Sequence, residues 1–386
     1  MLKKAFYFSL VILLMSPCFP GLSVCAEGRP NVSAKGAILM AADSGEILYE
    51  QNPDLQLPMA STTKIMTALL ALERAEEGNT VVRVTKTMVA VEGTSMGLLP
   101  DDRLTLADLA AGMLLASGND AANAAAIALA GSVEGFSEKM NQKAGELGMV
   151  NSHFVTPSGL DAESHYSTAR DMATLTRAAL QDYRFAEICG LRSRKIELKN
   201  DRVLSVYNHN KLLHMYEGCI GVKTGFTKKS GRCLVSAAQR NGVTLIAVTL
   251  SAADDWNAHM SLFDYGFSRM MSHNGTAEMA EAYRVPLVGG AEEEIRVLPT
   301  KFSGALLKKG SRADFTYEVQ LPRFVYAPLE EDQVVGQVVC KLNGEEVDRL
   351  DLLSAAEYAY RETGNAEKKK TGFFARLFGW GREKEE

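Results

Sequence analysis

The stretch STTKIMTALLALE, residues 61–73, decides how the chain is expected to fold. Its apolar residues recur at i, i+4 and i+7, which is the spacing of one buried helix face: Ile65, Leu69 and Leu72. Ser61 and Lys64 lie three residues apart on the first turn and therefore share a face. The stretch predicts a buried helix that begins near Ser61 with a hydroxyl and an amine side by side.

Ser61 and Lys64 form an SxxK pair whose residue types suit nucleophilic catalysis. A serine hydroxyl is a poor nucleophile alone and needs an adjacent base. Lysine can be that base when burial and nearby positive charge lower its pKa, and a helix N-terminus favours developing negative charge. An SxxK pair is common by chance, so it carries little weight by itself.

Two more polar triplets follow in the chain. Ser117-Gly118-Asn119 lies at a break between helical segments, and Lys223-Thr224-Gly225 lies on an expected strand. Alone, the first is a possible helix cap and the second a possible turn. The three triplets lie, in chain order, on a helix start, a helix–helix loop and a strand. In this arrangement they resemble the signature of serine penicillin-recognising enzymes.

Elements expected around the triplets indicate an α+β domain with helices covering a mainly antiparallel sheet. The expected strands are 36–42 and 46–50, 222–226 and 233–238, and 243–251, and the expected helices are 61–73, 105–116, 120–130, 133–147 and 256–270. Beyond residue 276, alternating strands at 314–319 and 334–342 with an Asn343-Gly344 turn predict a small all-β domain. The catalytic domain is expected at 27–275 and the β-rich domain at 276–362.

The two ends of the chain have their own patterns. Lys3 and Lys4, an apolar run at 5–15 and a small-residue cleavage pattern before Glu27 predict a secretory signal peptide at 1–26. The apolar run is shorter than the roughly 20 residues that span a bilayer, which makes a permanent anchor the weaker reading. A lipoprotein box ending at Cys25 is also disfavoured.

The tail, 363–386, reverses the charge of the body. The formal net charge of −5, which becomes −7 without residues 1–26, argues against a nucleic-acid partner. Residues 368–386 hold six basic and three acidic side chains among the apolar residues Phe373, Phe374, Leu377, Phe378 and Trp380. This pattern predicts a basic amphipathic helix on an anionic membrane surface, with a solvated tail as the alternative.

Cysteine and histidine give no metal pattern. Six Cys and six His are scattered without CxxC or paired helical spacing, so no metal is expected. Cys219 and Cys233 flank the expected hairpin, where a disulfide is a weaker hypothesis than buried free thiols.

Further segments resemble the D-alanyl-D-alanine carboxypeptidases of the low-molecular-weight penicillin-binding proteins. They lie in the family's order at 92–98, 154–161, 165–173 and 263–267. The resemblance implies a penicillin-binding/β-lactamase-like transpeptidase fold without a cofactor. It also implies peptidoglycan stem peptides as substrates, β-lactams as covalent inhibitors, and a secreted enzyme on the outer face of the cytoplasmic membrane.

Site roles follow from the same resemblance. Ser61 would be the acylated nucleophile, Lys64 its general base, and Ser117 the relay of a proton to the leaving amine.

The resemblance assigns substrate binding to the remaining motif residues. Asn119 would hold the substrate amide, and Lys223 and Thr224 the terminal carboxylate. Gly225 would allow close approach of the substrate. The backbone N–H of Phe226, where some relatives carry His, would form the oxyanion hole with that of the nucleophile.

Alternatives remain open at this point. Asp161 and His165 suggest a Ser-His-Asp triad, but in the family such residues shape a loop beside the site. A class A β-lactamase is disfavoured because no Glu-x-x-Leu-Asn motif lies between Ser117 and Lys223. A DD-endopeptidase uses the same residues, and a wall-binding scaffold without turnover is the non-enzymatic alternative.

Overall fold

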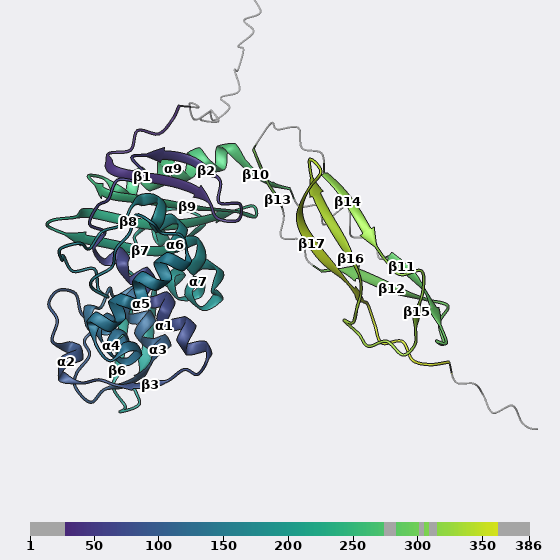
Figure 1. The fold of residues 1–386 in the computed structure, drawn as a ribbon, viewed down its shortest axis with the longest axis horizontal. Coiled ribbons are helices and arrows are strands. Elements are labelled where there is room, and N and C mark those ends of the chain that lie inside the picture. The colour runs from purple at the N-terminus through teal and green to yellow at the C-terminus, as the bar shows by residue number, and fades with distance from the viewer. Residues whose placement is uncertain (1–27, 274–282, 301–304, 309–314, 362–386) are drawn as a thin grey trace, which may run out of the picture.

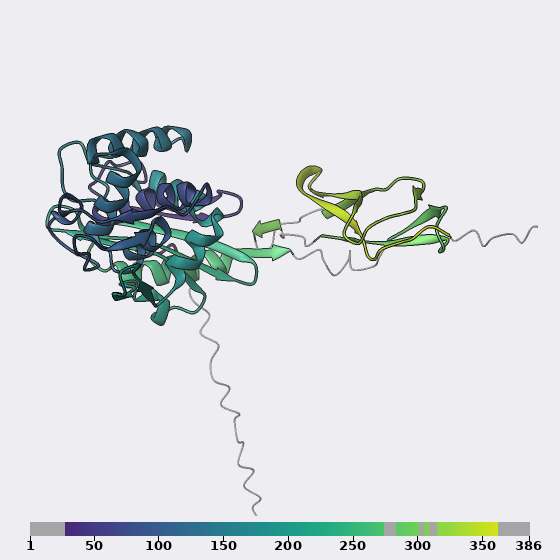
Figure 2. The same cartoon turned by 90° about the horizontal axis from the view of Figure 1, so that it is seen from below.

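The computed structural model describes residues 28–273, 283–300, 305–308 and 315–361 (Figure 1). The predictions of a signal peptide at 1–26 and of an amphipathic tail at 363–386 lie outside these residues. The described elements form two groups. A helical and sheet-containing catalytic domain lies on one side, and a β-domain extends away from it in both views (Figures 1 and 2).

A five-stranded antiparallel sheet forms the centre of the catalytic domain. Its order is β2 (Ile47–Gln51), β1 (Ala34–Ala41), β9 (Val243–Ala252), β8 (Gly231–Arg240) and β7 (Cys219–Thr227). The expected hairpins at 36–50 and 222–238 and the third strand at 243–251 are therefore confirmed. The strand that carries the third triplet, β7, lies at one edge of this sheet.

Both faces of the sheet are buried. On β1, Ile38 and Met40 point into the large cluster made with the helical block, whereas Leu39 packs with Leu262 and Phe263 of α9 (Asp255–Arg269) on the other face. Alternate side chains of a strand point to opposite faces, which is why one strand serves two apolar clusters. Burial of these clusters is the main favourable term that fixes the sheet between its helices.

The helical block contains the two remaining triplets. Its elements are η1 (Ala60–Thr63), α1 (Lys64–Glu76), α2 (Lys86–Val89), α3 (Leu106–Leu115), α4 (Asn119–Ala130), α5 (Val133–Glu146), α6 (Ala169–Gln181), α7 (Tyr183–Gly190) and α8 (Leu212–Met215). Two short ribbons accompany them, β3 (Val81–Arg83) with β4 (Arg103–Thr105) and β5 (Ser193–Glu197) with β6 (Val203–Tyr207).

Capping explains two helix starts, one predicted and one missed. Thr105 and Asp108 form a capping box at α3, as the sequence predicted. Thr168 accepts a hydrogen bond from the N–H of Asp171 at the start of α6, a helix that the sequence analysis did not identify. The Thr168-x-x-Asp171 spacing is a start signal that would have found it.

The β-domain is built on a six-stranded sheet. Its order is β14 (Phe315–Gln320), β16 (Val334–Leu342), β17 (Glu345–Ser354), β12 (Glu294–Pro299), β11 (Tyr283–Val288) and β15 (Val325–Tyr326). Asn343 and Gly344 have positive φ angles of 52° and 87° in the tight β16–β17 turn, which confirms the predicted hairpin. β10 (Met270–His273) pairs with β13 (Ala305–Lys308) where the two domains join.

The α+β fold class followed by an all-β unit is thus confirmed. Cys189, Cys219, Cys233 and Cys340 are free thiols, and Cys219 lies opposite Ala238 rather than Cys233. Among the residues that the structure describes, no helix combines the length and the apolar character needed to cross a membrane.

Candidate active site

Ser61 lies in a strained turn at the start of the buried helix. Ala60, just before it, has a positive φ of 49°, an unfavourable conformation for a residue with a Cβ. Gly225 of β7 packs against this turn so closely that an added Cβ would lie 3.0 Å from the Ser61 backbone N and 3.1 Å from the Met59 carbonyl. Glycine at 225 therefore brings the edge strand against the backbone of Ser61.

Lys64 is fully buried, and its amine contacts three oxygen atoms. Its Nζ lies 3.0 Å from Ser61 Oγ, 2.7 Å from Asn119 Oδ1 and 2.6 Å from the Ser158 carbonyl oxygen. Burial and the nearby positive charge of Lys223 hold the pKa of Lys64 well below its usual value. The geometry and the lowered pKa both fit a general base beside Ser61.

The loop 154–161 supplies the Ser158 carbonyl and is held against the helix that carries Lys64. Thr67 donates a hydrogen bond to the Pro157 carbonyl at 2.7 Å. Gly159 has a φ of 82°, and an added Cβ there would overlap the carbonyl of Ala60. The loop therefore approaches the Ser61 turn at a distance that only glycine permits.

His165 joins this loop to the nucleophile helix. Its Nδ1 accepts from the Val155 N–H at 2.9 Å, so its Nε2 carries the proton and donates to Thr63 Oγ1 at 3.0 Å. Burial, with a smaller effect of His153, lowers the pKa of His165 to about 4. Asp161 accepts instead from Thr227 Oγ1 at 3.0 Å, so these contacts do not assemble the Ser-His-Asp triad considered from the sequence.

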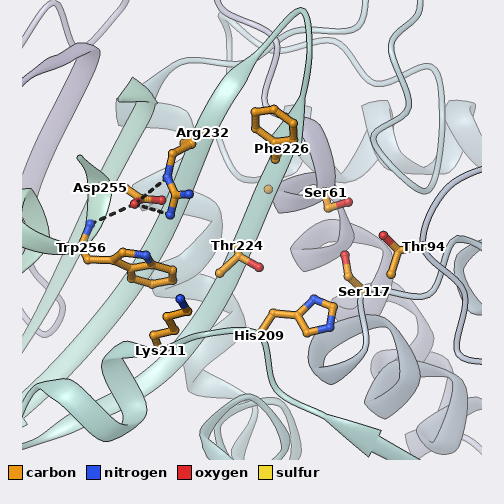
Figure 3. A pocket seen from close by; sticks show the side chains of 11 residues that line it. Ser61, Thr94, Ser117, His209, Lys211, Thr224, Phe226, Arg232, Asp255 and Trp256 are labelled. Carbon is orange, nitrogen blue, oxygen red and sulfur yellow. Dashed lines mark hydrogen bonds and ion pairs between the residues drawn. The ribbon is translucent and has the colours of Figure 1, made fainter. Parts of the chain in front are cut away.

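The second triplet forms the turn between α3 and α4. Ser117 has a positive φ of 58° and lines the pocket beside Ser61 (Figure 3). Asn119 is buried, and both ends of its amide are engaged: Oδ1 accepts from Lys64, and Nδ2 donates to the Glu92 carbonyl at 2.7 Å. The predicted contact of Asn119 with a substrate amide stays a prediction.

Asp120, which the sequence analysis did not single out, fixes the loop opposite this turn. Its buried carboxylate accepts from the backbone N–H groups of Met96, Gly97 and Leu98 and from the hydroxyl of Ser95. Asp120 follows the SxN triplet directly, and no motif at the sequence level marks it. It ties the 95–98 loop to the start of α4.

In the third triplet, Lys223 is buried, whereas Thr224 lines the pocket. The Nζ of Lys223 donates to the Thr224 carbonyl at 2.8 Å. Burial lowers the pKa of Lys223 to about 7. Thr224, Gly225 and Phe226 line the pocket, and the charge of Lys223 acts on the neighbouring Lys64.

A pocket of about 330 Å³ opens beside Ser61 (Figure 3). It is lined by Ser61, Thr94, Ser117, His209, Lys211, Thr224, Gly225, Phe226, Arg232, Asp255 and Trp256. His209, Lys211, Arg232, Asp255 and Trp256 were missed from the sequence. They follow β6, lie on β8 or begin α9, and only the folded chain brings them together.

The far wall of the pocket is built around Arg232. Its guanidinium contacts the buried Asp255 carboxylate at 2.7 and 2.9 Å and lies 5.6 Å from the ring centre of Trp256. Lys211 lies beside Trp256 on the same side of Thr224 (Figure 3). Within the described part of the chain, no group of three His, Cys, Asp or Glu side chains is arranged to hold a metal ion.

Comparison with known proteins identifies relatives of both domains. Residues 23–254 match the D-alanyl-D-alanine carboxypeptidase family, and residues 277–360 match the C-terminal domain of penicillin-binding protein 5. The D-alanyl-D-alanine carboxypeptidase DacF of Bacillus subtilis is 32% identical over 352 residues, which cover 89% of this chain and 88% of DacF. A D-alanyl-D-alanine endopeptidase of Escherichia coli is 28% identical over 253 residues, which cover 64% of this chain and 81% of that protein.

The fold also matches solved structures. Penicillin-binding protein 5 from Haemophilus influenzae superposes with a TM-score of 0.62 at 27% identity, covering 86% of this chain and 99% of that one. The match extends over both domains rather than the catalytic domain alone.

The close approach of Gly159 to Ala60 leads to a first prediction. Gly159→Ala pushes the loop away from the Ser61 turn and displaces the Ser158 carbonyl from Lys64, so acylation of Ser61 by a fluorescent β-lactam should slow about hundredfold. Gly148→Ala is the matched control, because Gly148 has a similar φ of 72° but open space around it. That control should lose only about 1 kcal/mol of stability, and equal acylation rates for both variants would contradict the role of the contact.

Proposed function

This chain belongs to the D-alanyl-D-alanine carboxypeptidase family, and from that premise we propose that Ser61 is the residue it acylates. The chain is a serine-type enzyme that removes the terminal D-alanine from peptidoglycan stem peptides, and it binds β-lactams. The observation that carries the assignment of Ser61 is the 3.0 Å contact between its hydroxyl and the buried Lys64 amine at the pocket wall.

Lys64 acts as the base in its neutral form. A neutral amine has two N–H donors and one lone pair. The carbonyl of Ser158 and the amide oxygen of Asn119 accept the two N–H groups at 2.6 and 2.7 Å. The lone pair is then left for the Ser61 hydroxyl proton, which is the arrangement that proton abstraction requires.

Acylation proceeds by attack of Ser61 Oγ on the carbonyl carbon of the penultimate D-alanine. A C–O bond forms, the C–N bond to the terminal D-alanine breaks, and the proton taken by Lys64 passes through Ser117 to the leaving amine. The backbone N–H groups of Ser61 and Phe226 stabilise the negative oxygen of the intermediate. The packing of Gly225 against the Ser61 backbone supports this pairing.

The terminal carboxylate binds on the Thr224 side of the pocket. The Thr224 hydroxyl faces the pocket, and Lys211 adds positive charge to its wall, where Asp255 balances the charge of Arg232 (Figure 3). Lys223 supplies positive charge to this binding, and its ammonium group, which bonds the Thr224 carbonyl, has further N–H donors for the carboxylate. Water then hydrolyses the Ser61 ester and releases the shortened peptide.

We place the enzyme outside the cytoplasmic membrane. The signal-peptide pattern at 1–26 supports export, and the basic amphipathic pattern at 368–386 supports peripheral attachment to the outer face. The domain division proposed is a catalytic domain at 27–275, a β-rich domain at 276–362 and an anchoring tail at 363–386.

The assignment of Ser61 is tested by D-alanine release from a peptide ending Lys-D-Ala-D-Ala. The chain from residue 27 to 366 should release D-alanine, and Ser61→Ala should abolish both release and labelling by penicillin. Equal rates in the two proteins would remove Ser61 from the mechanism. Three other outcomes would point to the alternatives. If the parent is acylated by penicillin, releases no D-alanine and cleaves cross-linked muropeptide dimers, it is an endopeptidase. Rapid hydrolysis of penicillin would indicate a β-lactamase, and a folded parent that is not acylated would indicate a scaffold.

The pKa values of the two lysines predict a bell-shaped pH dependence of kcat/KM. The rate rises as Lys64 loses its proton and falls as the pH passes about 7, where Lys223 in the free enzyme loses its positive charge. Lys223→Gln should remove the descending limb. It should also move the ascending limb to higher pH, because the neighbouring charge that lowers the pKa of Lys64 is gone. An unchanged profile in this variant would exclude Lys223 as the titrating group.

Deletion of residues 368–386 tests attachment. The shortened chain should leave the membrane fraction and retain its rate of D-alanine release, because the pocket lies within the catalytic domain. Loss of activity together with release would show that the tail has a second role. A shortened chain that stays with membranes would overturn the tail as the anchor.

A further inference from the structure

Four large apolar side chains lie exposed at the end of the β-domain. Phe324 is 47% exposed, Tyr326 66%, Tyr360 64% and Val288 45%. We call these four residues the distal aromatic patch. Exposed aromatic residues gathered in one place are a feature of interaction sites rather than of ordinary protein surface.

Backbone pairing holds the patch together. Val288 of β11 lies opposite Tyr326 of β15 in a parallel pair, and the rings of Phe324 and Tyr326 meet edge to face with centres 5.4 Å apart. Tyr360 joins from the C-terminal segment, which forms a bridge to Gly290. Three stretches that are distant in sequence thus meet at one end of the sheet.

The patch lies where the described chain ends. Tyr360 immediately precedes Arg361, the last described residue, and this end of the β-domain points away from the catalytic domain in both views (Figures 1 and 2). The basic tail begins at Lys368. Seven residue steps span at most about 25 Å of extended chain, so a tail lying on a membrane keeps the patch within that distance of the surface.

The charges around the patch differ in sign from the net charge of the tail. Arg323 and Arg361 adjoin it, but the neighbouring loops carry more acid than base: Glu292, Glu293, Glu330, Glu331 and Glu357. This end of the domain therefore gains no attraction to anionic lipid from its own charge. Aromatic rings partition into the interfacial zone of a bilayer whatever the headgroup charge, with the tyrosine hydroxyls left in the polar layer.

We propose that the distal aromatic patch is a second membrane contact, which inserts into the interfacial zone of the bilayer and stands the β-domain on its end. The proposal rests on the peripheral attachment proposed above. The tail supplies electrostatic attraction, and the patch supplies an apolar contact that does not depend on attraction to lipid charge.

The experiment measures co-sedimentation of the chain from residue 27 to 386 with phosphatidylcholine vesicles, with and without phosphatidylglycerol. The double variant Phe324→Ser/Tyr326→Ser should lower the partition coefficient about tenfold, since partial burial of two rings is lost. The factor should be the same at low and high salt and in both vesicle types. Tyr207→Ser is the matched control, because Tyr207 is 65% exposed on the catalytic domain and should leave partitioning unchanged.

Removal of the tail separates failure of the patch from failure of the anchor. The chain from 27 to 361 should retain weak binding to phosphatidylcholine vesicles that the double variant abolishes. If the full chain binds but the double variant partitions equally, the patch proposal is overturned while the anchor stands. If deletion of the tail leaves binding at the full-chain level while the double variant still lowers it, the anchor fails and the patch stands.

Two further measurements control for the folding and the self-association of the double variant. The double variant should keep the circular dichroism spectrum and the thermal unfolding profile of the parent, which shows that the β-domain is folded, and it should release D-alanine at the parent rate. A change in its oligomeric state, with vesicle binding unaltered, would mean that the patch contacts a second copy of the chain and would overturn the proposal.

Discussion

The catalytic domain is organised around the buried amine of Lys64, which needs hydrogen-bond partners. Lys64 is fully enclosed, and an amine without partners in such a place costs several kcal/mol, whether charged or neutral. Its partners are Ser61 one turn before it, Asn119 at the start of α4 and the carbonyl of Ser158 in the 154–161 loop. Three segments must therefore converge on this atom, and their convergence builds the pocket wall.

Sequence reasoning succeeded where the signals are local. The i, i+4, i+7 spacing found α1, the Thr105 capping box found α3, and Asn343-Gly344 found the β16–β17 turn, because each depends on residues within a few positions of one another. It missed Arg232, whose position in the pocket depends on the pairing of β8 with its neighbours. It also missed the Ser158 contribution, since a backbone carbonyl can be supplied by any residue type and leaves no mark in the sequence.

Asn119 and Lys223 are motif residues that also bond other parts of the protein. Asn119 contacts Lys64 and the Glu92 carbonyl, and the Lys223 amine bonds the Thr224 carbonyl, while their contacts with substrate stay predictions. Asn119 orients the base, and Lys223 lowers the pKa of Lys64 through its charge. Both effects of Lys223 require its positive charge, so both are lost together as the pH passes its own pKa of about 7.

The junction between the domains would matter for an enzyme held at its C-terminal end, as proposed above. β10 and β13 pair over four positions from Met270 opposite Lys308 to His273 opposite Ala305. The connection therefore includes a two-stranded ribbon, whose cross-strand hydrogen bonds resist bending more than a single extended chain does. With the far end of the β-domain on a bilayer, the length of its sheet sets the height of the pocket above the lipid. The β-domain then determines which layer of the peptidoglycan Ser61 can reach, although it contributes no residue to the pocket.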